Sequence, residues 1–173
     1  MKLFFLFLLV ITLQNVNAQK QKANRDRHYF SVMPEVVAPL GAFDDGYYGG
    51  AGINVIMHYK WLKNRAEVQL IAGYERFKPK KGNIFGDITT IPVKMGLLQM
   101  ISKQFYLYGR VGVLGVKDQK SSFSTRFSTD AGLGLSLKKM TLDIGFHGWL
   151  RKSGGGFTNY FSAGVVLPFR RLN

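Results

Sequence analysis

Apolar and polar residues alternate with a period of two along nearly the whole chain, and this constrains the fold more than any other feature. Between residues 28 and 169 no stretch shows a convincing apolar period of 3.6 residues. Side chains of a β-strand point to opposite faces in turn, so the alternation predicts an all-β chain. We expect eight strands, at residues 28–40, 47–60, 65–77, 88–101, 105–116, 126–138, 140–151 and 157–169.

Strand length and loop length both favour a membrane barrel. Each expected strand is at least as long as the roughly 9–11 residues of a tilted membrane-crossing strand, and longer than the usual globular strand of about 5–6. Longer connections (41–46, 78–87, 117–125, 152–156) alternate with short turns (61–64, 102–104 and Lys138 to Met140). An up-and-down transmembrane barrel shows this alternation, with short turns in the periplasm and longer loops outside.

The two faces of the strands differ sharply in chemistry. One face carries Val, Leu, Ile and Phe without a charge. The other carries glycines and eleven polar residues: Glu35, Asn54, Glu67, Gln69, Lys94, Arg110, Asp130, Ser136, Asp143, His147 and Ser162. The interior of an eight-stranded barrel is only wide enough for side chains, so we expect the polar face inside. A soluble lipocalin-like barrel with the faces reversed is the alternative.

Aromatic residues gather near the ends of the expected strands. This pattern is typical of the two aromatic girdles of a membrane barrel. We expect Tyr47, Tyr74, Phe77, Phe123, Phe127 and Phe157 in the girdle at the loop end, and Tyr29, Tyr59, Trp61, Phe105 and Phe169 in the girdle at the turn end.

The first eighteen residues have the pattern of an export signal. Lys2 is followed by an apolar run over residues 3–13, and a polar stretch ends in Val-Asn-Ala. The run is too short for the roughly 20 residues of a spanning helix. We expect cleavage after Ala18, a short periplasmic segment at residues 19–27, and the barrel at residues 28–173.

Six polar residues are expected to form a charge network in the lumen: Glu35, Lys94, Arg110, Asp130, Asp143 and His147. Folding the hairpins symmetrically places Arg110 opposite Asp130, and Asp130 beside His147. Glu35 should project toward Arg110 from across the lumen. Because buried charges need partners, the network is interpreted as a structural plug of salt bridges.

A second interpretation of this row is catalytic. Asp130, His147 and Ser162 have the acid, base and nucleophile order of a hydrolase triad. We nevertheless predict no enzymatic activity, because an interior site is out of reach of lipid and fold analogy alone does not carry function. No metal or cofactor is expected, since the chain has no cysteine and His28, His58 and His147 lack ligand spacing.

The chain is strongly basic, with 24 Lys and Arg against 10 Asp and Glu. Export makes nucleic acid a poor candidate partner despite this charge. The turn end collects Lys60, Lys63, Arg65, Lys103, Lys138, Lys139, Arg170 and Arg171 without an acid. The loop end collects Arg76, Lys78, Lys80, Lys81, Lys117, Lys120, Arg126, Arg151 and Lys152 against Asp44, Asp45, Glu75, Asp87 and Asp118. We expect the outer rim to meet lipopolysaccharide and the inner rim to meet phospholipid headgroups, or both simply to be solvated.

Two segments carry a family resemblance. Together with the export signal and a first strand near Tyr29, the sequences Ile-Pro-Val-Lys-Met-Gly-Leu at 91–97 and Phe-Tyr-Leu-Tyr-Gly-Arg-Val-Gly at 105–112 resemble the small outer-membrane β-barrel proteins of the Bacteroidetes, with a barrel of the OmpA and OmpX type. The resemblance implies an eight-stranded barrel in the outer membrane of a Gram-negative bacterium, inserted by the barrel assembly machinery. One departure is that Phe169 is followed by four more residues, whereas such chains often end on an aromatic.

These observations lead to one expected function and two alternatives. We expect a structural or interaction protein of the cell envelope. A narrow conduit for small solutes is the first alternative, and an outer-membrane lipid-modifying enzyme is the second. A wide porin is excluded, because sixteen strands would leave under ten residues for each strand with its loop.

Overall fold

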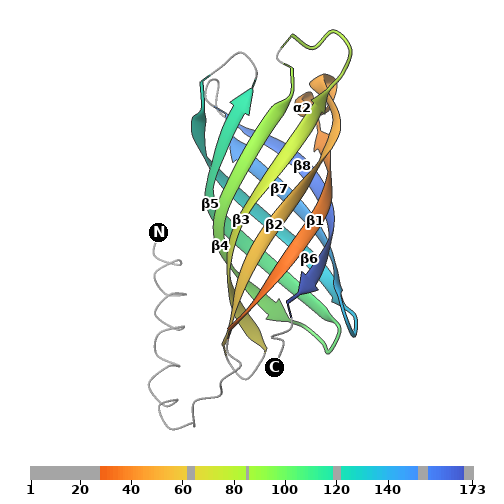
Figure 1. Ribbon diagram of the computed structural model, residues 1–173, viewed down its shortest axis with the longest axis vertical. Coiled ribbons are helices and arrows are strands. Elements are labelled where there is room, and N and C mark those ends of the chain that lie inside the picture. Colours follow the sequence, from red (N-terminus) through yellow and green to blue (C-terminus); the bar gives the residue numbers. More distant parts are fainter. Residues whose placement is uncertain (1–27, 62–64, 85, 119–121, 152–155, 170–173) are drawn as a thin grey trace.

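The chain folds into a closed antiparallel barrel of eight strands (Figure 1). The computed structural model describes residues 28–61, 65–84, 86–118, 122–151 and 156–169. The strands are β1 (His28–Leu40), β2 (Tyr47–Trp61), β3 (Ala66–Pro79), β4 (Ile88–Met100), β5 (Phe105–Asp118), β6 (Ser124–Ser136), β7 (Thr141–Leu150) and β8 (Phe157–Pro168). The predicted fold class is confirmed. The predicted signal peptide, its cleavage after Ala18 and the segment 19–27 lie outside the described residues.

A short helix, α2 (Ala42–Gly46), lies in the first loop, where the periodicity indicated no helix. It follows Gly41, whose φ of 57° lies in the left-handed region that favours glycine. Five residues are too few to produce a periodic pattern, which explains why the sequence did not reveal it. The helix turns Phe43 inward, where it is 7% exposed.

The hairpin registers follow the symmetry expected from the sequence. Arg110 pairs with Asp130 between β5 and β6, and Asp130 pairs with His147 between β6 and β7. The three residues therefore lie in one row across three strands.

The barrel closes where the first strand meets the last. β1 pairs with β8 in two stretches, from Ser31 to Val32 and from Glu35 to Leu40, with a gap at Met33 and Pro34. Proline has no N–H to donate, which weakens the ladder at this position. At the turn end the backbone N–H of Phe169 donates to the carbonyl of Phe30 at 2.8 Å.

The apolar face of the strands points outward and the polar face points into the lumen. Val36, Met95 and Ile144 are more than half exposed, whereas Lys94 and Arg110 are under 5% exposed. This confirms the expected orientation, and the reversed lipocalin-like arrangement is wrong for the described chain. Among the described residues, no helix has the length and apolarity needed to cross a membrane.

A cluster of apolar side chains fills the loop end of the lumen. It comprises Val37, Phe43, Tyr47, Phe77, Leu114, Val116, Trp149 and Tyr160, and we call it the loop-end plug. Phe43 packs against Tyr47, Phe77 and Trp149 with ring centroids 4.9–5.2 Å apart.

The expected aromatic girdles are wrong at several positions, because some of their residues point into the lumen. Tyr47 and Phe77 were expected to face lipid, but they are 5% and 0% exposed. A register shift between Tyr47 and Gly49 turns Tyr47 inward and leaves Tyr48 exposed. Tyr29, expected at the turn end, directs its hydroxyl to the buried Glu67 at 2.9 Å.

Candidate functional site: the polar lumen

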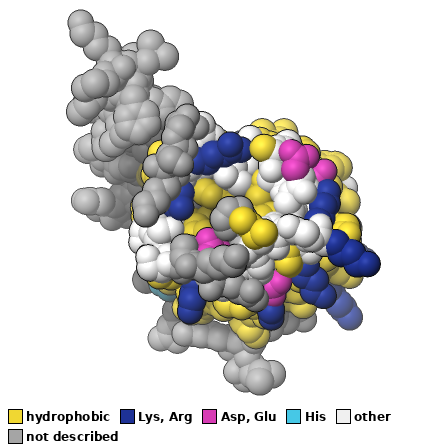
Figure 2. All heavy atoms as spheres, turned by 90° about the horizontal axis from the view of Figure 1, so that it is seen from above, with side chains coloured by type: hydrophobic (Ala, Val, Ile, Leu, Met, Phe, Trp, Pro, Cys, Tyr) yellow, Lys and Arg dark blue, Asp and Glu magenta, His cyan; other side chains and the backbone are white. Residues whose placement is uncertain are grey.

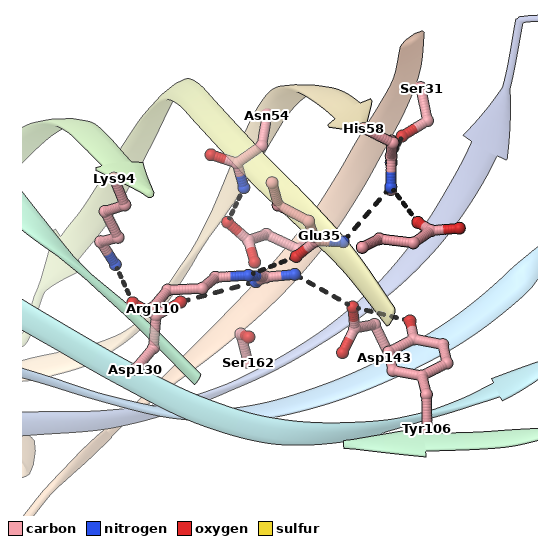
Figure 3. Close-up of polar contacts among 12 residues, drawn as sticks. Ser31, Glu35, Asn54, His58, Lys94, Tyr106, Arg110, Asp130, Asp143 and Ser162 are labelled. Carbon is pink, nitrogen blue, oxygen red and sulfur yellow. Dashed lines mark hydrogen bonds and ion pairs between the residues drawn. The ribbon is translucent and has the colours of Figure 1, made fainter. Parts of the chain in front are cut away.

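The centre of the lumen holds two cations around one carboxylate (Figure 3). Lys94 Nζ lies 2.9 Å from Asp130 Oδ1, and Arg110 Nη1 lies 3.5 Å from Asp130 Oδ2. Arg110 also lies 3.7 Å from Asp143 through Nη2 and donates from Nε to Gln69 Oε1 at 3.0 Å. All these groups are buried. The arrangement links strands β3 to β7 through charge and hydrogen bonds.

Glu35 does not pair with Arg110, contrary to expectation. Its Oε1 instead accepts a hydrogen bond from Asn54 Nδ2 at 2.5 Å. The nearest partners of Arg110 lie on β3, β6 and β7, and none lies on β1. Lumen-crossing contacts depend on side-chain reach, which strand registers do not specify.

Glu75 belongs to the lumen, although the sequence analysis assigned it to the loop rim. It is 1% exposed and accepts hydrogen bonds from Thr90 Oγ1 at 2.7 Å and from the Tyr160 hydroxyl at 3.1 Å. Glu35 pairs with Gly52, and Gly52 pairs with Glu75, so the glycine separates two inward carboxylates. The signal for Glu75 was its odd-numbered position on β3, the same parity as Glu67 and Gln69.

Glycines make room for two lumenal tyrosines. A Cβ on Gly134 would lie 2.1 Å from Tyr106 Cζ, and one on Gly132 would lie 2.3 Å from the Tyr108 hydroxyl. Tyr106 donates to Asp143 Oδ2 at 3.1 Å, and the Arg110 guanidinium lies 3.8 Å from the centroid of the Tyr108 ring. The glycines of β6 thus allow aromatic rings to pack flat against the inner wall.

The predicted row of Asp130, His147 and Ser162 is brought together. His147 Nε2 lies 2.7 Å from Ser162 Oγ, while Nδ1 lies 3.7 Å from Asp130 Oδ2. Lys94 Nζ lies 3.5 Å from the same Nδ1, so the acid does not hold the imidazole alone. The Tyr160 ring stacks on the imidazole at 4.6 Å.

A second relay of the same type was missed by the sequence analysis. Ser31 Oγ lies 2.7 Å from His58 Nε2, and His58 Nδ1 lies 2.9 Å from Glu67 Oε2. These are the contacts of a Ser-His-acid triad. The signal was available, because the three residues sit at inward positions displaced by two from direct pairing on β1, β2 and β3.

Both relays are buried inside the barrel. Ser31 is fully buried and Ser162 is 6% exposed. The loop-end plug lies over one end of the lumen, and the Tyr29 ring stacks on His58 at 4.2 Å near the other. A nucleophile must meet its substrate, so this geometry favours positioning of charges over chemistry. In the part of the chain that is described, no three His, Asp or Glu side chains are grouped to hold a metal.

Comparison with solved structures shows the same fold in membrane proteins. The outer-membrane protein Ail of Yersinia pestis in a phospholipid bilayer nanodisc matches with a TM-score of 0.58 and 18% identity, over 82% of this chain and 99% of Ail. Neisserial surface protein A matches with a TM-score of 0.52 and 15% identity, over 83% and 98% of the two chains. A de novo designed transmembrane β-barrel matches with a TM-score of 0.51 and 11% identity, over 87% and 100%. No protein-family model and no curated protein matches the sequence.

Proposed function

We propose that this chain is an outer-membrane β-barrel of a Gram-negative bacterium with a structural or interaction role in the cell envelope. The observation that carries the proposal is the polarity of the barrel. Its outer surface is apolar between the two rims, and its buried core is charged and hydrogen-bonded. A surface of this kind is stable against hydrocarbon, because closure of the barrel pairs the backbone groups of the edge strands. The resemblance of the segments at 91–97 and 105–112 to small barrels of the Bacteroidetes supports the further proposal that the bacterium belongs to this group.

We further propose that the lumen does not conduct. The loop-end plug fills one end, and the Lys94, Arg110 and Asp130 network fills the middle. Eight strands leave room for side chains and no channel. The conduit remains the alternative, and it requires both layers to move aside.

A lipid-modifying enzyme is the less favoured function. The Ser-His-acid relays support it by geometry, but their hydroxyls are buried inside the wall. Lipid lies on the opposite face of every strand, so an acyl chain would have to enter the filled lumen.

The proposed partners of the loop end are the phosphates of lipopolysaccharide, and insertion is assigned to the barrel assembly machinery. Figure 2 shows this end of the molecule, with Lys and Arg side chains around its edge. On the outer wall, Arg76 of β3 lies opposite Thr89 of β4 in the strand register, and Thr89 lies opposite Lys117 of β5. The basic pair thus lies above apolar residues that include Ile91. Ail has been crystallised with the heparin analogue sucrose octasulfate, a polyanion, which supports this proposal by analogy.

Three measurements test the proposed function. The protein should fractionate with outer membranes and migrate differently on a gel before and after boiling, because the closed ladder survives cold detergent. Purified protein should give no step conductance in planar bilayers, and deleting the gene should leave the mass of lipid A unchanged. A soluble periplasmic protein with a single gel mobility would overturn the proposal.

A further inference from the structure

Four exposed basic residues lie on the turns at the end of the barrel opposite the plug. They are Arg65, Lys103, Lys138 and Lys139, and we call them the turn-end arc. No ion pair joins any of them to an acid within the described chain. The described carboxylate nearest in sequence is Glu67, and its side chain faces inward to His58. The arc is therefore a concentration of uncompensated positive charge.

Backbone hydrogen bonds connect the turns that carry the arc. The N–H of Met100 donates to the carbonyl of Arg65 at 2.8 Å, and the N–H of Ser136 donates to the carbonyl of Gln104 at 2.6 Å. Leu137 N donates to Met140 O at 2.8 Å and closes a tight turn with Lys138 and Lys139 at its tip. The cations are thus held on one continuous segment of the rim.

Exposed apolar side chains lie on the same turns as the cations. Ile101 is 63% exposed, Phe105 is 49% exposed, and Leu137 and Met140 are each about two-fifths exposed. Aromatic and aliphatic residues at a barrel end mark the boundary of the hydrocarbon. Lys103, Lys138 and Lys139 lie within two residues of one of these side chains, and Arg65 is hydrogen-bonded through its carbonyl to Met100, next to Ile101, which places the cations at the depth of lipid phosphates.

We propose that the turn-end arc is a binding site for the headgroups of anionic phospholipids. This inference rests on the proposed membrane location and goes beyond it by naming the residues and the lipid class. Interleaving of apolar and basic residues on short turns suits a ligand with a phosphate and an acyl chain. A wholly polar polyanion such as peptidoglycan would make no use of Ile101, Leu137 and Met140.

The test compares lipid affinities of matched charge variants. The turn-end variant carries Arg65→Gln, Lys103→Gln, Lys138→Gln and Lys139→Gln. The control carries Lys78→Gln, Lys80→Gln, Lys81→Gln and Arg151→Gln, four surface residues at the loop end outside the Arg76 and Lys117 pair; Asp44, Asp45 and Asp87 also lie at this end, and Lys80 pairs with Asp44 at 3.2 Å. Native mass spectrometry of the full-length protein counts bound dioleoylphosphatidylglycerol and dioleoylphosphatidylcholine, which share an acyl chain and differ in net charge.

We expect the wild-type protein to prefer the anionic lipid and the turn-end variant to lose at least tenfold of that preference. Each basic residue near an anionic surface contributes about fivefold in affinity, so four charges exceed this threshold. The control should stay within about threefold, because acids already offset its charge. Equal loss in both variants, or no loss in either, would overturn the inference.

Two further readouts separate this inference from its premises. All variants are checked for heat-modifiable gel mobility, so a folded membrane barrel without lipid preference overturns the inference alone and leaves the proposed function standing. Purified peptidoglycan sacculi form the second arm. If the turn-end variant loses binding to sacculi while its lipid preference is unchanged, the arc recognises the cell wall and the lipid assignment is wrong.

Discussion

Arg110 contacts four lumenal groups on four different strands. Its guanidinium contacts Asp130, Asp143 and Gln69, and the ring of Tyr108 lies against it. Breaking a buried ion pair from one side leaves an uncompensated charge, which costs more than the pair itself contributes. The loss of stability caused by a substitution in this network should therefore depend strongly on which partner of the ion pair is removed.

Arg110→Met should lower the free energy of unfolding by about 3–5 kcal/mol, because it leaves buried carboxylates without their cation. Adding Asp130→Asn should recover part of the loss, and urea unfolding in lipid vesicles measures both. Lys78→Met, at an exposed site, is the control and should change stability by less than about 0.5 kcal/mol. Strict additivity of the two lumenal substitutions would contradict the contact.

The two buried serines should be inert toward electrophiles. A fluorophosphonate probe should label neither Ser31 nor Ser162, because each hydroxyl is covered although each is bonded to an imidazole. Ser31→Ala should instead lower stability by about 1–3 kcal/mol by leaving His58 Nε2 unpartnered. Labelling of the native protein that disappears in Ser31→Ala or Ser162→Ala would favour the lipid-modifying enzyme over the structural or interaction role.

At the scale of elements, α2 contributes Phe43 to the loop-end plug that fills one end of the lumen. Phe43→Ala removes the ring that packs on Tyr47, Phe77 and Trp149. We expect a loss of about 2–4 kcal/mol, at the lower end for a buried aromatic because a loop residue can relax. Tyr48→Ala, which truncates an exposed ring beside the plug, is the matched control. Similar losses in the two variants would show that Phe43 does not hold the plug together.

The lengths of the connections predict the orientation of the barrel. A cysteine at Lys81, in the long loop after β3, should react on whole cells with an impermeant thiol reagent, whereas one at Lys139 should not. The natural chain has no cysteine, so there is no background. Equal reaction at both sites would remove the link between loop length and sidedness.

The strands and their registers could be predicted from the sequence more completely than the individual contacts between side chains in the lumen. A period of two specifies which residues point inward, and hairpin symmetry then places Arg110 beside Asp130 and Asp130 beside His147. Glu35 could not be placed in this way. It accepts a hydrogen bond from Asn54 and does not contact Arg110, and this depends on how far each side chain reaches across the lumen. Tyr47 could not be placed either, since one register shift reverses the face that a residue presents.

At the scale of the whole molecule, the barrel is polar inside and apolar outside. Its core therefore depends on charge pairing and aromatic packing, and in the proposed membrane location lipid covers the apolar residues of the outer wall. An exposed apolar belt of this extent is typical of a surface that is covered by a membrane or a partner. The order of its strands is also simple, since each pairs with its neighbour in sequence except at one junction.

That junction makes the barrel a ring whose beginning and end are interchangeable. Residue 169 lies beside residue 30 at the turn end, two residues from the start of β1 at residue 28, with the Phe169 amide donating to the Phe30 carbonyl. A circular permutant that joins residue 169 to residue 28 with a short linker and opens in the loop at 81–82 should still give a heat-modifiable barrel. It should fold at a rate similar to that of the natural chain, because the pairing of β1 with β8 becomes a local hairpin while the pairing of β3 with β4 becomes the long-range closure. A permutant that inserts but stays unfolded would show that the native order of synthesis is needed for closure.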